Sequence, residues 1–359
     1  MKKLVPHAIA LAVLATAAAS ANAQSTLTVF GLMDLSVNSV KNGSTTTKSM
    51  DTAGLNTSRI GFRGTEDLGG GLLAGFWLEA GVSGDTGGAG GGTGYNSSNA
   101  STTGFFNRRS TLSLSGGFGE VRLGRDYTVN FNVSGKFDAF GANGFGNGAN
   151  LYANKSPFDK SSTATTMGAA SALRVNNAVS YFLPKDLGGF YGQVQVGAPE
   201  GVAGNGYKGG LFGYAAGPVD VAFSYSQIDV FTSDKLKTTN LGGSYNFGVA
   251  KVYALYNQSK YGALKYTTYE LSTSVPLGQG EFRASYGKGN AEGGTAAFNN
   301  SDATLWGLEY LYNLSKRTAV YAQTGSLKNK GASAMSVGGL GDATGAKSTG
   351  YGVGVRHMF

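Results

Sequence analysis

Most side chains in this sequence that could do chemistry are arginines, and several of them stand at alternating positions. Within residues 57–66, Ile60 and Phe62 mark an apolar face, so Arg59 and Arg63 share the opposite face. Successive side chains of a β-strand point to opposite sides of the sheet. The spacing therefore predicts rows of guanidinium groups along one side of a sheet, where they would attract and orient anions. By the same count, the polar faces of other segments carry Asp34, Glu79, Arg109, Arg122, Arg174, Arg283 and Arg356.

The sequence offers few residues for metal binding or covalent catalysis. It has no cysteine and two histidines, His7 and His357. Without thiols, a Cys or Cys/His metal site is excluded, and a Ser-His triad would require His357 once the leader is removed. The glycine-rich segment 87–99 lacks the lysine and the strand-to-helix context of a phosphate loop. We therefore expect no catalytic residue, no metal, no cofactor and no enzymatic activity.

Residues 1–23 predict a cleaved export signal. Two lysines precede a short apolar run at 8–19, and Ala21-Asn22-Ala23 fits the small-x-small cleavage pattern. The apolar run is about half of the ~20 residues that a membrane-spanning helix needs, which disfavours an N-terminal anchor. Cleavage between Ala23 and Gln24 would leave residues 24–359 as a single domain. Loss of the two lysines would lower the net charge from +8 to +6.

Polar and apolar residues alternate through much of the remaining chain. From Leu27 to Val37 nearly every second residue is apolar, and residues 350–359 repeat the pattern around Tyr351, Val353 and Val355. Period two sustained over about ten residues is typical of tilted strands that cross an outer membrane. A soluble β-sandwich is disfavoured because its strands average about five or six residues. No later run approaches 18 apolar residues, which excludes a transmembrane helix.

Short turns and long polar segments alternate between the predicted strands. This alternation is typical of an antiparallel transmembrane β-barrel with short periplasmic turns and long extracellular loops. We count 16 strands, with the weakest boundaries near 190–215 and 249–275. The predicted turns are 67–71, 116–119, 183–189, 217–218, 277–280 and 314–317. The predicted loops are 41–54, 83–104, 127–172, 228–238, 290–301 and 328–348.

Several of these segments resemble the general porins of β-proteobacteria, the group that includes the Bordetella, Burkholderia, Comamonas and neisserial porins. The resembling blocks are STLTVFGLMDLSV at the start, TSRIGFRGTEDLGGGLLAGFWLE, RRSTLSLSGGFGEVRLGRD, RVNNAVSYFLPKDLGGF and the closing GYGVGVRHMF. The resemblance implies a homotrimer whose third long loop, 127–172, folds into the lumen. It also implies that Phe359 is the terminal aromatic recognised by the outer-membrane assembly machinery.

The resemblance places Arg59, Arg108 and Arg174 at matching positions of the arginine cluster that lines the constriction in anion-selective members. In residues 174–183, Val175 and Val179 mark the outward face, which turns Arg174 inward. Strict alternation would send Arg108 into lipid at a cost of ~2–4 kcal/mol near the midplane, so we expect a rim position or a bulge there. The arginines would either line the pore or brace the barrel against loop carbonyls. Our candidate constriction set is Arg59, Arg63, Arg108, Arg109, Arg122, Arg174 and, on the loop, Asp138.

The expected function is that of a general diffusion porin in the Gram-negative outer membrane, with weak anion selectivity for small ions and hydrophilic solutes. The alternatives are a substrate-specific channel and a surface adhesin or receptor built on the same barrel. Lysines scattered through the loops would contact lipopolysaccharide or remain solvated. Nucleic acid is not expected as a partner, because no basic patch is interleaved with aromatic residues.

Overall fold

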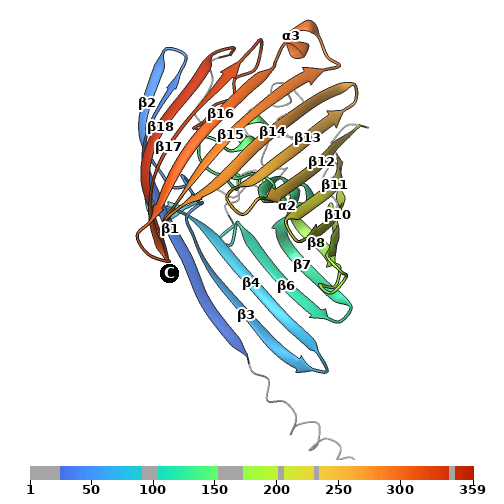
Figure 1. Ribbon diagram of the computed structural model, residues 1–359. Helices are drawn as coiled ribbons and strands as arrows, with labels where there is room; N and C mark the ends of the chain where they lie inside the picture. The colour runs from blue at the N-terminus through green and yellow to red at the C-terminus, as the bar shows by residue number, and fades with distance from the viewer. Residues whose placement is uncertain (1–24, 91–103, 153–172, 201–205, 230–233, 339–343) are drawn as a thin grey trace, which may run out of the picture.

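Sixteen long strands close into one antiparallel barrel in the computed structural model (Figure 1), which describes residues 25–90, 104–152, 173–200, 206–229, 234–338 and 344–359. Each strand pairs with its neighbours in the chain, and β1 closes the ring by pairing with both β3 and β18. The strands are β1 (Thr26–Asn42), β3 (Arg59–Gly69), β4 (Leu72–Ser83), β6 (Arg109–Gly116), β7 (Gly119–Tyr127), β8 (Arg174–Phe182), β9 (Phe190–Gly197), β10 (Tyr207–Ala216), β11 (Val219–Asp229), β12 (Lys235–Asn246), β13 (Lys251–Tyr261), β14 (Leu264–Leu277), β15 (Gly280–Glu292), β16 (Ala303–Asn313), β17 (Thr318–Asn329) and β18 (Lys347–Met358). The predicted fold and strand number are confirmed.

Two further strands of the 18-stranded sheet belong to loops. β2 (Thr45–Asp51) folds back on the end of β1 and occupies the edge above β3. β5 (Gly88–Ala89) pairs with the end of β4. The first predicted loop, 41–54, is therefore largely a β-hairpin that extends the wall.

The alternation of apolar and polar residues along the strands gives the barrel an apolar exterior and a polar interior. On β11, Val221 and Phe223 are exposed, whereas Ala222 and Ser224 between them are buried. A lipid-facing apolar surface around a polar lumen is the arrangement of an outer-membrane barrel. Among the described residues, no helix is long and apolar enough to cross a membrane.

Connections at one end of the barrel are short, and we call this end the turn side. All six predicted turns connect neighbouring strands there, and a seventh at 247–250 joins β12 to β13. At the opposite end, the loop side, two connections were missed: residues 198–206 between β9 and β10, and the two-residue turn 262–263 between β13 and β14. These fall in or beside the segments where the sequence pattern was weakest.

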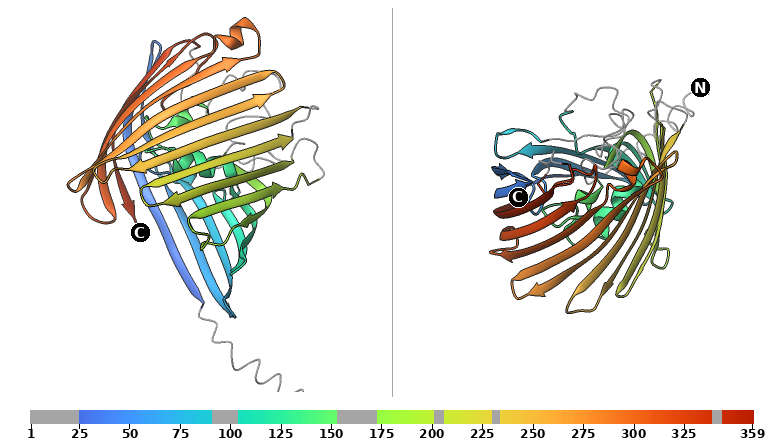
Figure 2. Two further views of the ribbon diagram at one scale, coloured as in Figure 1. Left: turned by 45° about the vertical axis from the view of Figure 1, so that its right-hand side comes forward. Right: turned by 90° about the horizontal axis from the view of Figure 1, so that it is seen from above.

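The described part of the third long loop lies inside the barrel (Figure 2). It forms α2 (Val129–Lys136), which begins where the Thr128 hydroxyl accepts a bond from the Phe131 backbone N–H, and a 3₁₀ turn, η1 (Gly148–Leu151). Asn130 of α2 donates to the Ser224 hydroxyl and the Thr238 carbonyl, at 3.3 and 3.2 Å. The inward fold of this loop is confirmed, and residues 153–172 lie outside the described part of the chain.

Strand β8 departs from the predicted alternation. Between Gly124 and Asp126 of β7 the register with β8 shifts, and Asn177 has a φ of 52°. A β-bulge of this kind resets which side of the strand each residue faces. Val175, predicted to face lipid, is instead fully buried in a cluster with Tyr207, Ile228 and Leu236.

On the loop side, a short helix, α3 (Ala296–Asn299), follows β15.

The predicted export signal, with its cleavage point between Ala23 and Gln24, lies outside the described residues. At the other end of the chain, Phe359 pairs with Gly31 of β1. The Phe359 N–H donates to the Gly31 carbonyl at 3.0 Å, and the Gly31 N–H donates back at 3.1 Å. The last residue of the chain therefore helps to close the barrel.

Candidate functional site

Adjacent strands bring the predicted arginines together on the lumen side of one wall. The register places Arg63 opposite Trp77, and Glu79 of β4 opposite Arg109 of β6. All four residues lie on the inward phase of their strands, so their side chains meet in the lumen. We call the group formed by Arg59, Arg63, Arg108, Arg109, Arg122 and Arg174 the arginine cluster.

Glu79 is the acidic centre of one half of the cluster. Its Oε1 atom lies 2.5 Å from Nε of Arg108 and 3.5 Å from Nη1 of Arg59. The indole N–H of Trp77 donates to the other carboxylate oxygen at 3.1 Å. Glu79 and Arg108 are both buried, and paired hydrogen bonds of this kind offset the cost of burying charge.

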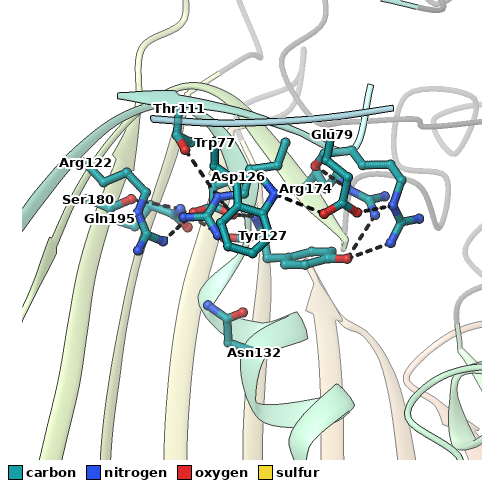
Figure 3. A network of polar contacts seen from close by, with 12 residues as sticks. Trp77, Glu79, Thr111, Arg122, Asp126, Tyr127, Asn132, Arg174, Ser180 and Gln195 are labelled. Atoms are coloured by element: carbon teal, nitrogen blue, oxygen red, sulfur yellow. Dashed lines mark hydrogen bonds and ion pairs between the residues drawn. The ribbon is translucent and has the colours of Figure 1, made fainter. Parts of the chain in front are cut away.

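Tyr127 joins Arg108 to Arg174 at the point where the third loop leaves β7 (Figure 3). Its hydroxyl accepts from Nη2 of Arg108 at 3.0 Å and from Nη2 of Arg174 at 3.2 Å. The Arg174 guanidinium also stacks over the tyrosine ring, 4.7 Å from the ring centre, and its Nε donates to the Arg108 carbonyl at 2.9 Å. The Tyr127 ring packs against Phe131 of α2, which ties the loop to the cluster.

Asp126 is the acidic centre of the other half. Its carboxylate lies 2.6 Å from Nη1 of Arg122 and 3.6 Å from Nε of Arg109. On the turn side, Oε1 of Glu120 lies 2.8 Å from Nη2 of Arg122. Arg109 stacks over the Trp77 ring at 4.5 Å. Arg109 and Arg122 are thus each held between a carboxylate and an aromatic ring.

The cluster carries more positive than negative charge. Arg63 is the most exposed member and lies between the rings of Phe30 and Trp77, at 5.2 and 5.1 Å, and none of the described carboxylates forms an ion pair with it. The six arginines of the cluster and the three carboxylates that pair with them, Glu79, Glu120 and Asp126, together carry a net charge of +3. A fixed positive wall in a narrow channel favours the entry of anions.

Both Arg108 and Arg109 enter the cluster, although alternation allowed only one of them to face inward. β6 begins at Arg109, so Arg108 lies just beyond the strand and its backbone N–H donates to the Glu79 carbonyl at 3.0 Å. This position just before β6 lets the Arg108 side chain reach Glu79 in the cluster instead of facing lipid.

Asp138 lies apart from the cluster, inside the third loop. Its carboxylate accepts from the backbone N–H groups of Phe140, Ala142 and Gly148, at 2.8, 3.0 and 3.3 Å. Burial raises the pKa of the Asp138 carboxyl above its usual value. These three hydrogen bonds within the loop indicate that Asp138 stabilises the conformation of the loop.

The other predicted inward charges lie outside the cluster, Arg283 on the wall across the barrel, and Asp34 and Arg356 on the neighbouring strands β1 and β18. Arg283 is paired with Glu281 at 2.5 Å and with Glu309 at 3.1 Å, and Arg356 donates to the Asn56 side chain at 3.1 Å. Asp34, which the alternation assigns to a polar face, accepts from the backbone N–H groups of Leu55 and Asn56 at 2.8 and 2.7 Å and so anchors the first loop.

Sequence reasoning missed two residues that organise the cluster, Tyr127 and Asp126. Asp126 stands on the same phase as Arg122 and could have been found from the alternation in residues 119–127. Tyr127 could not, because its place depends on the β7–β8 bulge and on the path of the loop. Among the described residues, no group of His, Cys, Asp and Glu has the arrangement of a metal site.

Comparison with known proteins identifies the type of channel. The family model for Gram-negative porins matches residues 10–332. The chain belongs to the Gram-negative porin family. Outer membrane porin protein 32 of Delftia acidovorans is 39% identical, covering 98% of this chain and 99% of that protein, and an outer-membrane porin of Bordetella pertussis is 28% identical over the full length of both.

Solved porin structures share the fold of this porin. The anion-selective porin from Comamonas acidovorans has a TM-score of 0.77 and 36% identity, covering 94% of this chain and 100% of that one. OmpT of Vibrio cholerae in its trimer form has a TM-score of 0.66 at 15% identity, covering 93% and 99%, a likeness of fold alone. The protein is therefore a pore-forming β-barrel of the Gram-negative outer membrane, and members of its family are passive channels rather than enzymes.

Proposed function

We propose that this porin is a general diffusion channel with weak to moderate preference for anions, set by the arginine cluster. The net charge of +3 carried by the cluster and its three carboxylate partners is the observation that carries the proposal. The likeness to a porin described as anion-selective supports it. Small hydrophilic solutes would pass down their gradients through the same opening.

The third loop supplies the opposite side of the proposed constriction. Residues 128–152 cross the lumen, and the Phe145 N–H donates to Gln323 of β17 at 2.9 Å on the far wall. A loop held at both ends narrows the path beside the cluster, and the cluster acts most strongly on ions where the path is narrowest. In this proposal Asp138 fixes the shape of the loop and thereby the width of the constriction.

Because protein contacts fix the arginine side chains, we expect the channel to select solutes by charge rather than to recognise one particular solute. Each guanidinium already has protein partners, so an ion that passes meets a positive field rather than an empty binding pocket. A substrate-specific channel on the same barrel would instead show conductance that saturates as its solute is added. Nothing in the described loops favours the adhesin or receptor alternative.

We further propose that this porin assembles as a homotrimer in the outer membrane, among lipids and lipopolysaccharide. The trimer form of a solved structure with the same fold supports the assembly. Removal of residues 1–23 would precede membrane insertion. Phe359, half-exposed on the outward surface, would serve as the signal for the assembly machinery.

The selectivity proposal can be tested by replacing two arginines whose loss leaves no carboxylate of the cluster without an arginine partner. In an Arg59→Gln/Arg174→Gln double variant, Glu79 keeps Arg108 as its partner. A unit charge ~7 Å from an ion in water is worth about 0.6 kcal/mol, so before screening each lost charge should lower the entry of chloride and raise that of potassium roughly two- to threefold, and the chloride-to-potassium permeability ratio should fall by the product of the two factors. Reversal potentials in a salt gradient across a planar bilayer measure the ratio.

The matched control removes the same number of positive charges from outside the cluster. An Arg283→Gln/Arg356→Gln double variant should change the reversal potential much less, because both residues lie outside the cluster. If the cluster variant keeps the wild-type reversal potential while its barrel is intact, the constriction does not lie at these arginines.

A further inference from the structure

A recess of about 650 Å³ lies in the lumen between α2 and the turn side of the barrel. Its lining is mainly apolar, with contributions from α2 and from the inward faces of β4, β8, β9 and β10. The diffusion of ions does not require an apolar wall, whereas small-molecule sites are typically apolar recesses of this size with a few placed polar groups. The main apolar lining residues are Leu73, Val133, Phe182, Leu183, Tyr191 and Leu211.

Gln193 gives the recess a hydrogen-bond donor that the described residues leave unpaired. The side chain is 5% exposed and lines the recess. Its Oε1 atom accepts from Nδ2 of Asn132 at 2.9 Å, which fixes the orientation of the amide. Its Nε2 atom has no hydrogen-bond partner among the described residues. A buried N–H group is costly when unpaired, so a ligand that offers an acceptor here would gain affinity.

A cation stands on the same face of α2. Lys136 follows Asn132 by four residues, one helical turn, so both side chains point toward the recess. Its ammonium lies 2.8 Å from Asp220 and 3.9 Å from the centre of the Tyr191 ring. In Figure 3, Asn132 extends from α2 below the arginine cluster, so the recess adjoins the path of an anion that has passed the constriction.

The charged residues around the recess are balanced in sign, so they do not favour the binding of anions in general. Lys136 is partnered by Asp220, and Glu120 is held by Arg122, whose guanidinium stacks 4.2 Å above the Phe182 ring. The remaining charged lining residues are one of each sign, Lys185 and Asp186. Affinity therefore requires an apolar body together with a hydrogen-bond acceptor.

We propose that this recess is a binding subsite for small carboxylates with an apolar body, such as an aromatic monocarboxylate. The apolar body packs against Leu211, Phe182 and Val133. One carboxylate oxygen accepts from Nε2 of Gln193, and the negative charge lies near Lys136. The inference rests on the proposed function, because solutes reach the recess through the lumen.

Benzoate binding to the refolded porin in lipid nanodiscs, followed by ligand-observed NMR at pH 7.5, tests the subsite. Acetate carries the same charge without the ring, and benzyl alcohol carries the ring without the carboxylate. Benzoate should bind saturably and at least fivefold more tightly than either of them. Equal binding of benzoate and acetate, or of benzoate and benzyl alcohol, would contradict the proposal.

Two variants separate the parts of the site. Gln193→Glu keeps an acceptor for Asn132 but loses the Nε2 donor, and it should weaken benzoate binding at least fivefold. Leu211→Ala should weaken benzoate binding while leaving acetate binding unchanged. Gln279→Glu, in the turn between β14 and β15, is the matched control and should bind benzoate like the wild type.

Unchanged benzoate affinity in both Gln193→Glu and Leu211→Ala would place the binding elsewhere and overturn the assignment. Because binding is measured without current, the result is independent of ion selectivity. A reversal potential recorded on the same preparation tests the proposed function separately, so failure of either proposal can be recognised.

Discussion

The guanidinium groups of the arginine cluster differ in how firmly their neighbours hold them. Arg108 is buried and bonded to both Glu79 and Tyr127, whereas Arg63 is exposed to the lumen between two aromatic rings. Removing one partner of a buried ion pair is costly because the other charge is left behind. Removing a solvated charge changes the local field at little cost in stability. The cluster thus combines arginines that buried contacts hold in place with one exposed charge that can interact with passing ions.

Glu79→Gln should raise anion preference, the direction opposite to that of the arginine variants. Loss of the carboxylate leaves Arg59 and Arg108 uncompensated, which increases the chloride permeability ratio roughly twofold. It should also cost about 3 kcal/mol of stability, because Arg108 remains buried. Reversal potential and thermal unfolding of the refolded porin measure the two effects, with Glu281→Gln on the other wall as control. A shift toward potassium would contradict the role assigned to Glu79.

At the scale of elements, the strand ends and the third loop decide which charges meet. The regular parts of the strands follow the alternation, so Arg59, Arg63, Arg109 and Arg122 could be assigned to the lumen from the sequence alone. The end of β6 and the bulge in β8 could not, since both depend on how neighbouring strands pair. These two irregularities bring Arg108 into the cluster and turn Val175 inward.

The path of the third loop was predicted only by family resemblance. No periodicity in residues 127–172 indicates that Asn130 would bond to the far wall or that Asp138 would bond to its own loop. Such contacts join residues far apart in the chain, and local sequence patterns carry little information about them. For the same reason, the recess beside α2 was not foreseen.

Asp138→Ala should loosen the loop and widen the constriction. The carboxylate accepts three backbone hydrogen bonds, which no alanine side chain replaces. Single-channel conductance should rise and its noise increase, while the barrel remains folded because no strand loses a partner. Asp67→Ala, at the exposed turn-side end of β3, is the matched control and should conduct like the wild type. Unchanged conductance in Asp138→Ala would mean that this residue does not set the width of the pore.

At the scale of the whole molecule, the barrel separates two solvents. Apolar side chains such as Val353 and Leu241 are more than half exposed on the outside, where lipid or a neighbouring subunit would cover them. The polar inside is spanned by a loop and carries its excess positive charge on one wall. The fold therefore turns a simple alternation of residues into a channel with an asymmetric electric field.

A homotrimer is the expected assembly of this porin in the membrane. The mass of the particle in lipid nanodiscs, measured by light scattering with the lipid contribution subtracted, should equal that of three chains. A mass of one chain under conditions where the channel conducts would contradict the trimer, without affecting the proposed constriction.

In the proposed function, the arginine cluster makes this channel prefer anions. The most direct test is the zero-current potential of the refolded porin in a planar bilayer that separates two concentrations of potassium chloride. We predict a potential whose sign corresponds to faster passage of chloride, from channels that insert in conductance steps of three. A potential that favours potassium would contradict this role of the cluster and assign control of selectivity to the carboxylates of the lumen.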